Sequence, residues 1–306
     1  MTANLPGADR YKRIARAAAV LTALPVAAAA QTANTPDLSG IWGRWLHFEQ
    51  PASGPGPIVN LAHTPAGTMD DYRWVGDYMN PILKPEAAAI VKKRGEMAMS
   101  GSLAPNAHAQ CRPEPTPYIL AVEIGLEIVQ RKDEVLLLYM SGHLVRHIRM
   151  NATHPAHVIP SWQGDSVGHY EGGTLVIDTI GQKVGPLAMV DNYGTPFSAS
   201  LHVIERYRLV DGKNSSATES KHERTYFPPG VPTNASARGD IDPDAGKKGL
   251  QVEVTVEDPV MFTTPWTGIV TYRRAQGGWA EAICAENPNA YYGSDAGIPS
   301  AEKPDF

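Results

Sequence analysis

Residues 125–140, GLEIVQRKDEVLLLYM, hold two short apolar runs on either side of a charged tetrapeptide. The runs 125–130 and 135–140 have the composition of strands, and 131–134 between them is typical of a hairpin turn. Residues 144–150 continue the same pattern. This part of the chain therefore predicts a β-meander.

Similar short runs follow and precede this stretch. The expected strands are 38–45, 167–170, 174–180, 201–210, 250–256, 269–273 and 279–284. Glu171-Gly172-Gly173 and Gln276-Gly277-Gly278 predict hairpin turns, Asp211-Gly212 predicts a further turn, and 228–248 predicts a long loop.

Only residues 84–97 predict a convincing helix, since Pro85 suits a first helical turn and basic residues follow an apolar face. With one long helix there is no alternation of strands and helices, which argues against a parallel α/β fold. We predict an all-β fold, an antiparallel sandwich or barrel of lipocalin-like architecture with one peripheral helix.

The composition is that of a folded protein. The chain has 306 residues, 42 % of them hydrophobic and 19 % charged, and its 28 glycines and 26 prolines favour many short elements. A formal net charge of −5 gives no reason to expect nucleic acid or an anionic membrane as partner. We expect one domain over residues 31–306.

The N-terminus has the pattern of a signal peptide, residues 1–30. A basic stretch containing Arg13 and Arg16 precedes the uncharged run 17–30, which ends in Ala28-Ala29-Ala30 before Gln31. The run is short for a permanent membrane anchor, although a retained anchor helix is the alternative. We predict cleavage after Ala30, a periplasmic or secreted product, and no membrane span after cleavage.

Cys111 and Cys284 are the only cysteines. An even number in an exported chain predicts one disulfide between them, and two buried free thiols are the alternative. An oxidising compartment favours the disulfide.

Residues 143–179 concentrate the ionisable side chains. They hold five of the ten histidines, which are His143, His147, His154, His157 and His169. Because histidine titrates near neutral pH, we predict proton transfer by His154, His169 and His202, with Asp165 as a carboxylate partner. We expect His154 and His169 on the wall of one cavity.

A metal site is the less favoured alternative. The histidine spacings match no zinc signature, and residues four apart on a strand lie roughly 13 Å from each other. The chain also has no dinucleotide fingerprint and no phosphate-binding loop of the Walker A type. We therefore predict no cofactor.

Gly164-Asp165-Ser166-Val167-Gly168 matches G-x-S-x-G, but a hairpin follows it rather than the helix of a hydrolase elbow. A turn is the stronger interpretation, and a Ser166 nucleophile with His169 or His202 as base is the weaker one. The predicted substrate-binding residues are Trp162, Ser166, Glu171, Arg206 and Trp266. A structural role in ion pairs or in the apolar core is one explanation for such residues, and a role in lining a ligand cavity is the other.

SWQGDSVGHYEGGTLVIDT at 161–179 and LHVIERYRLV at 201–210, with VEVTVEDP, TPWT and CAEN further on, resemble a family known from sequence. It is a largely uncharacterised family of exported bacterial all-β proteins with a GDSxGxxEGxTLVxDT central motif. The resemblance covers most of the mature chain, with departures at His147 and Gly173, where the family has Arg and Asp. It implies export and an all-β fold, and carries no established reaction.

Two function classes follow. The first is an exported cofactor-independent enzyme that acts on a small organic molecule by His/carboxylate acid–base chemistry, as a lyase, hydratase, isomerase or hydrolase. The second is a periplasmic lipocalin-like protein that binds a small ligand. Two titratable groups that meet in the cavity with shifted pKa values favour the enzyme, because a binding protein needs only shape and a few polar anchors.

Overall fold

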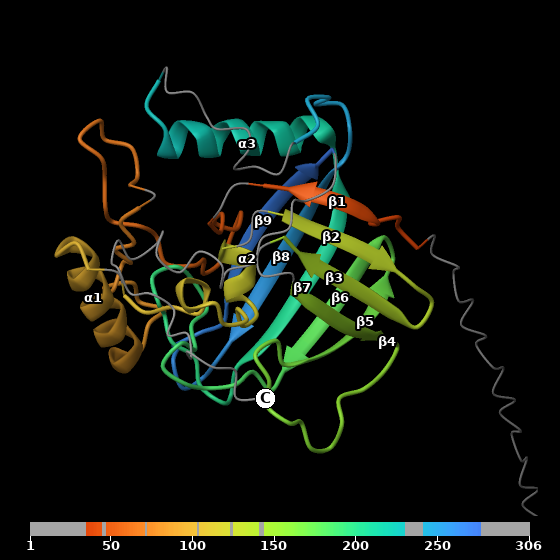
Figure 1. The fold of residues 1–306 in the computed structure, drawn as a ribbon, viewed down its shortest axis with the longest axis horizontal. Helices are drawn as coiled ribbons and strands as arrows, with labels where there is room; N and C mark the ends of the chain where they lie inside the picture. The colour runs from red at the N-terminus through yellow and green to blue at the C-terminus, as the bar shows by residue number, and fades with distance from the viewer. Residues whose placement is uncertain are drawn as a thin grey trace, which may run out of the picture. The chain divides into compact units, whose positions relative to one another are not determined.

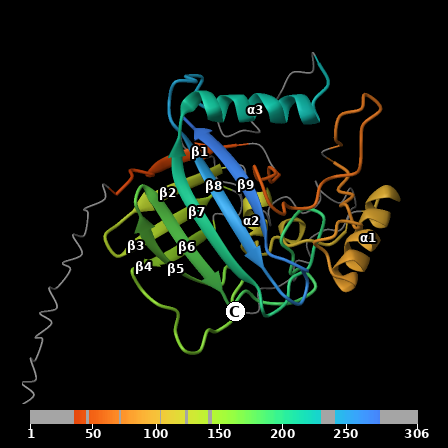
Figure 2. The same ribbon diagram turned by 180° about the vertical axis from the view of Figure 1, so that it is seen from behind.

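The computed structural model describes residues 35–276, apart from 45–46, 71, 103, 123–124, 141–143 and 230–240. Its strands form a closed barrel in which each strand pairs with the next along the chain, and β1 also pairs with β9 (Figures 1 and 2). The strands are β1 Gly40–Gly43, β2 Gly125–Gln130, β3 Glu134–Tyr139, β4 Val145–Met150, β5 Asp165–Glu171, β6 Thr174–Ile180, β7 His202–Val210, β8 Gly249–Glu257 and β9 Trp266–Arg274. The predicted all-β barrel is confirmed.

One strand pair departs from the expected antiparallel arrangement. β4 and β5 are parallel, with Arg149 opposite Val167, whereas the other neighbours around the described barrel are antiparallel. A ring of nine strands cannot alternate direction throughout, so at least one pair has to be parallel. A parallel pair needs a long connection instead of a tight turn, and residues 151–164 provide it. In Figure 1 this loop extends away from the barrel at its lower end.

Alternation along the strands separates a buried interior from an outer face. β4 buries every second residue, and β7, β8 and β9 show the same period over most of their length. The interior holds a large apolar core, which includes Trp42, Leu137, Ile177, Val252 and Trp266. Residues one position apart on a strand therefore face opposite environments.

The two long helices, α1 Pro85–Met99 and α3 Gly212–Tyr226, lie outside the barrel wall, whereas the short α2 Tyr118–Val122 is buried against the core. α1 begins at a proline, buries Ala87, Val91 and Gly95, and confirms the helix predicted over 84–97. α3 packs near β8 and β9, and the 3₁₀ turn η1 covers His108–Gln110 (Figure 1).

Helix α3 was not expected from the sequence. Asp211 was predicted to form a turn, but its carboxylate instead accepts a hydrogen bond from the Lys213 backbone N–H at 2.9 Å and caps the helix. α3 buries only Gly212 and Ser215. A helix without an apolar face shows no helical periodicity of apolar residues in the sequence.

Several predictions fall outside the described residues. They concern the signal peptide 1–30, His143, the hairpin at 276–278, the strand 279–284 and Cys284. The predicted Cys111–Cys284 disulfide and the single domain over 31–306 therefore remain predictions. Among the described residues, the helices are too short or too polar to cross a membrane.

Candidate functional site

The register of four strands brings ionisable residues from distant positions together on the outer face of the barrel. Asp165 at the start of β5 pairs with Ile180 of β6, which pairs with His202 of β7, which pairs with Glu257 of β8. Asp178 lies two positions before Ile180 and shares its face. The strand ends and the 151–164 loop thus meet at one place.

Two histidines, three carboxylates and one arginine form a continuous series of contacts, here called the histidine–carboxylate chain. Its members are Arg149, Asp165, His154, Asp178, His202 and Glu257. His154 Nδ1 lies 2.6 Å from Asp165 Oδ1, and His154 Nε2 lies 3.1 Å from Asp178 Oδ1. The same Asp178 oxygen is 3.0 Å from His202 Nε2, and His202 Nδ1 is 3.3 Å from Glu257 Oε2. Arg149 donates to both Asp165 oxygens, at 2.7 and 2.9 Å.

Every ring nitrogen of the two histidines faces a carboxylate oxygen. An ionised carboxylate only accepts hydrogen bonds, so all four contacts are hydrogen bonds only when both imidazoles are protonated. In that state three cations alternate with three anions along the chain. Removing one proton leaves a nitrogen lone pair against a carboxylate and weakens that contact, which provides an acid and a base side by side.

The centre of the chain is accessible to solvent. The exposed side-chain fractions are 20 % for His154, 38 % for Asp178 and 32 % for His202. The loop before β5 adds apolar surface nearby in sequence, since Ile159 is 87 % exposed and the half-buried Trp162 ring lies under Lys183. The side chains at the centre of the chain are therefore open to solvent.

Three predicted residues form a separate exposed group. His169 Nε2 lies 2.9 Å from Glu171, and Arg206 donates to the other Glu171 oxygen at 2.6 Å. The hydrogen bond from Arg206, and then that from His169, lowers the pKa of Glu171. Arg206 is four positions from His202 on β7, roughly 13 Å along the strand. Among the described contacts, none links this group to His154.

Two predicted substrate-binding residues lie in the barrel interior. Ser166 is buried, and its hydroxyl contacts Arg146 Nε at 3.1 Å and Thr179 at 3.0 Å instead of a histidine. Trp266 is a buried core residue packed edge-on against Phe262. Alternation on β5 separates Ser166 from Asp165, so the turn that the sequence suggested is instead the start of a strand.

The sequence did not predict a buried ion pair that lies inside the barrel. Arg146 on β4 contacts Glu205 on β7 through both terminal nitrogens, at 3.1 and 2.5 Å, and Tyr207 donates to Glu205 at 2.8 Å. Burial alone lowers the pKa of Arg146, but attraction to Glu205 outweighs it and the net pKa is raised. The signal was present in HVIERYRLV, where Glu205 shares a face with Val203 and Tyr207.

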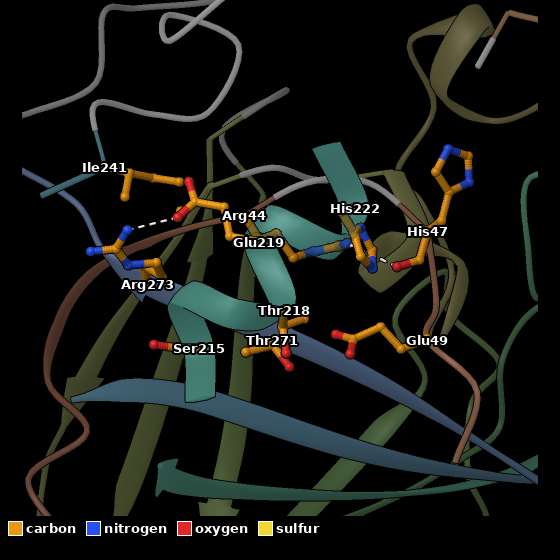
Figure 3. A pocket seen from close by; sticks show the side chains of 11 residues that line it. Arg44, His47, Glu49, Ser215, Thr218, Glu219, His222, Ile241, Thr271 and Arg273 are labelled. Atoms are coloured by element: carbon orange, nitrogen blue, oxygen red, sulfur yellow. Dashed lines mark hydrogen bonds and ion pairs between the residues drawn. The ribbon is translucent and has the colours of Figure 1, made fainter. Parts of the chain in front are cut away.

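Ionisable side chains also gather beneath α3 (Figure 3). Glu219 of α3 and Arg273 of β9 form a partly buried ion pair at 2.7 Å, and Arg44 and Glu49 line the same pocket. Burial raises the pKa of Glu49. The free space is about 10 Å³, which is about the room one water molecule needs. This pocket is too small for an organic substrate.

Within the described ranges, no group of three histidine, cysteine, aspartate or glutamate residues has the geometry to hold a metal ion.

Comparison with known proteins adds no assignment. No protein-family model matches the chain, and no curated protein or solved structure is significantly similar to it.

Proposed function

We propose that this protein is an exported, cofactor-independent enzyme that acts on a small organic molecule by acid–base chemistry at His154, Asp178 and His202. The observation that carries the proposal is the single Asp178 oxygen placed between the Nε2 atoms of two imidazoles, at 3.1 and 3.0 Å. Two titratable groups on one carboxylate supply the acid–base pair that such an enzyme needs.

The outer carboxylates orient the two rings. Asp165 holds Nδ1 of His154 and Glu257 holds Nδ1 of His202, which leaves the two Nε2 atoms directed at the centre. With one imidazole protonated and the other neutral, a substrate that takes the place of Asp178 at both Nε2 atoms receives a proton from the first imidazole and loses a proton to the second. Elimination, hydration and isomerisation need this pairing, and ester hydrolysis needs its base.

The barrel interior favours this proposal over a lipocalin-like binding protein. Large side chains, among them Trp42, Tyr139, Tyr207 and Tyr272, are buried there. Arg146 and Glu205 are also buried and bonded to each other. The solvent-accessible groups of the histidine–carboxylate chain instead lie on the outer face.

Solvent isotope incorporation tests the proposal and does not require an identified substrate. The mature protein is incubated with a bacterial metabolite extract in D₂O and, separately, in H₂¹⁸O, and the products are followed by mass spectrometry. Enzyme-dependent deuterium at a carbon position is expected in the product of a hydratase or isomerase, and in the unreacted substrate of a lyase through reversal of the elimination. ¹⁸O in a new carboxylate is expected for a hydrolase. Absence of both labels across the extract would contradict the proposal.

Variants then assign the reaction to the site. His154→Gln, His202→Gln and Asp178→Asn are each expected to lower turnover about 100-fold or more with the fold intact. His147→Gln is the matched control, because His147 also lies on the outer face against a carboxylate, Glu134, at 2.6 Å. Equal activity in all four variants would remove the assignment.

Export is tested separately. The intact mass of the protein recovered from the periplasm or medium is expected to correspond to a chain that begins at Gln31. A mass that retains residues 1–30 would contradict cleavage after Ala30.

A further inference from the structure

A cleft beside α1 is a second place where a small molecule fits. It has a volume of about 270 Å³ and lies away from the histidine–carboxylate chain, between α1 and the segments around residues 72–74, 101–106 and 192–193. This is close to the lower end of the range for small-molecule sites. Its lining includes Tyr72, Arg73, Trp74, Arg94, Asn192 and Tyr193.

The cleft is cationic although the chain is acidic overall. Its described lining contains two arginines, Arg73 and Arg94, and no acidic residue, whereas the whole chain has a net charge of −5. Arg73 reaches Asp70 only at 3.7 Å, and within the described residues no carboxylate lies within 4 Å of Arg94. A small anion is therefore attracted to this surface more than to the rest of the molecule.

Arg94 is well placed to bind an anion. It donates to the carbonyl oxygens of Pro105 at 2.8 Å and Pro186 at 3.3 Å, which fixes the guanidinium and uses two of its five N–H groups. Burial lowers the pKa of Arg94, because the cation is partly removed from water, and the attraction of Tyr118 and of Asp191 offsets this only in part. A bound carboxylate would offset that desolvation.

Aromatic residues and one amide complete the cleft. Tyr72 is 92 % exposed, and the half-buried Trp74 and the buried Tyr193 also line the cleft. Asn192 donates from Nδ2 to the Ala121 carbonyl at 3.1 Å, so its orientation is defined, and among the described residues its buried Oδ1 has no hydrogen-bond partner. A buried unpaired acceptor calls for a donor, such as a hydroxyl group.

We propose that this cleft binds a small hydroxyaromatic carboxylate. Its carboxylate pairs with Arg73 and Arg94, its ring lies against the aromatic residues, and its hydroxyl donates to Asn192 Oδ1. The proposal is independent of the reaction at His154 and His202, since it requires binding alone.

Calorimetric titration of the mature protein with 6-hydroxy-2-naphthoate tests the proposal. 2-Naphthol, which lacks the carboxylate, is expected to bind at least about tenfold more weakly, and 2-naphthoate, which lacks the hydroxyl, about fivefold more weakly. No binding of the hydroxynaphthoate at millimolar concentration, or equal affinity for 2-naphthol, would overturn the proposal.

Variants locate the site. Arg73→Gln is expected to weaken binding of the hydroxynaphthoate about tenfold or more, and Arg94→Gln likewise. Because Arg94 also holds two backbone carbonyls, its variant is first checked by thermal unfolding, whereas the exposed Arg73 carries the test if Arg94→Gln is unstable. Arg131→Gln removes an equally exposed arginine elsewhere and is expected to bind as wild type. Wild-type affinity in Arg73→Gln would place the ligand elsewhere and refute the proposal.

Discussion

Two arginine–glutamate pairs, each with one partner on β7, differ in their surroundings. Arg146 and Glu205 are buried in the barrel interior, while Arg206 and Glu171 lie half-exposed on its outer face. In the interior each charge has lost its water, so each depends on the other, whereas water replaces a lost partner on the surface. Burial therefore determines which of the two pairs contributes strongly to the stability of the fold.

The buried pair gives a prediction for stability. Arg146→Met or Glu205→Leu alone leaves one charge unpaired in the interior and is expected to lower the free energy of unfolding by about 3–5 kcal/mol. The double variant removes both charges and is expected to regain most of that loss. Urea unfolding of the four proteins measures the effect.

The exposed pair is the control for this measurement. Arg206→Met is expected to leave the urea midpoint close to wild type, since its partner Glu171 remains in water. A double variant as unstable as the sum of the two single variants would show that the interior does not couple Arg146 to Glu205.

Glu49 gives a prediction for pH dependence. Burial raises its pKa above the ordinary value of 4.5, so the folded state binds more protons than the unfolded state over the range above 4.5. Its contribution to stability is therefore complete below pH 4.5 and is lost as pH rises through the raised pKa. The Glu49→Gln variant has no ionisable side chain at this position, so it does not lose this contribution to stability as pH rises.

Urea unfolding of wild type and Glu49→Gln at pH 4 and pH 7 measures this contribution. The variant is expected to gain stability relative to wild type between pH 4 and pH 7, while groups common to both proteins cancel in the difference. A difference that stays constant with pH would mean that burial of Glu49 has no energetic consequence.

At the scale of the elements, α3 depends on its ends because it has little apolar contact. Asp211→Ala removes the acceptor for the Lys213 N–H and is expected to cost about 1 kcal/mol and to lower helicity. Asp211→Asn keeps a capping oxygen and is expected to stay close to wild type. Far-ultraviolet circular dichroism and amide exchange of 212–226 measure the effect, and equal protection in Asp211→Ala would contradict the cap.

For the whole molecule, the predicted Cys111–Cys284 bond gives a prediction about unfolding. It would close a loop of well over a hundred residues around most of the barrel, so its loss in Cys284→Ser is expected to cost about 2–5 kcal/mol. Peptide mapping under non-reducing conditions tests for the bond in the protein recovered from the periplasm or medium. Two free thiols there would refute it.

Local sequence patterns were sufficient to place several of the strands and the helix α1. Period-two alternation and turn residues give β2, β3, β5 and β6 to within about two residues, and Pro85 with the apolar positions of the next turns gives α1. These features depend on neighbours close in sequence. α3 escaped the same reasoning because its side chains face water on almost all sides, so no hydrophobic period marks it.

The sequence by itself therefore determined the all-β class, most strand positions and the concentration of histidines after residue 143. Only the tertiary structure decided barrel closure, the parallel pairing of β4 with β5, and the side of the wall on which each residue lies. It joined His154 and His202 through Asp178, left His169 apart from them, and turned Ser166 inward. The physical reason is register: which residues of distant strands stand opposite each other depends on long-range backbone pairing, and a shift of one residue exchanges the two faces.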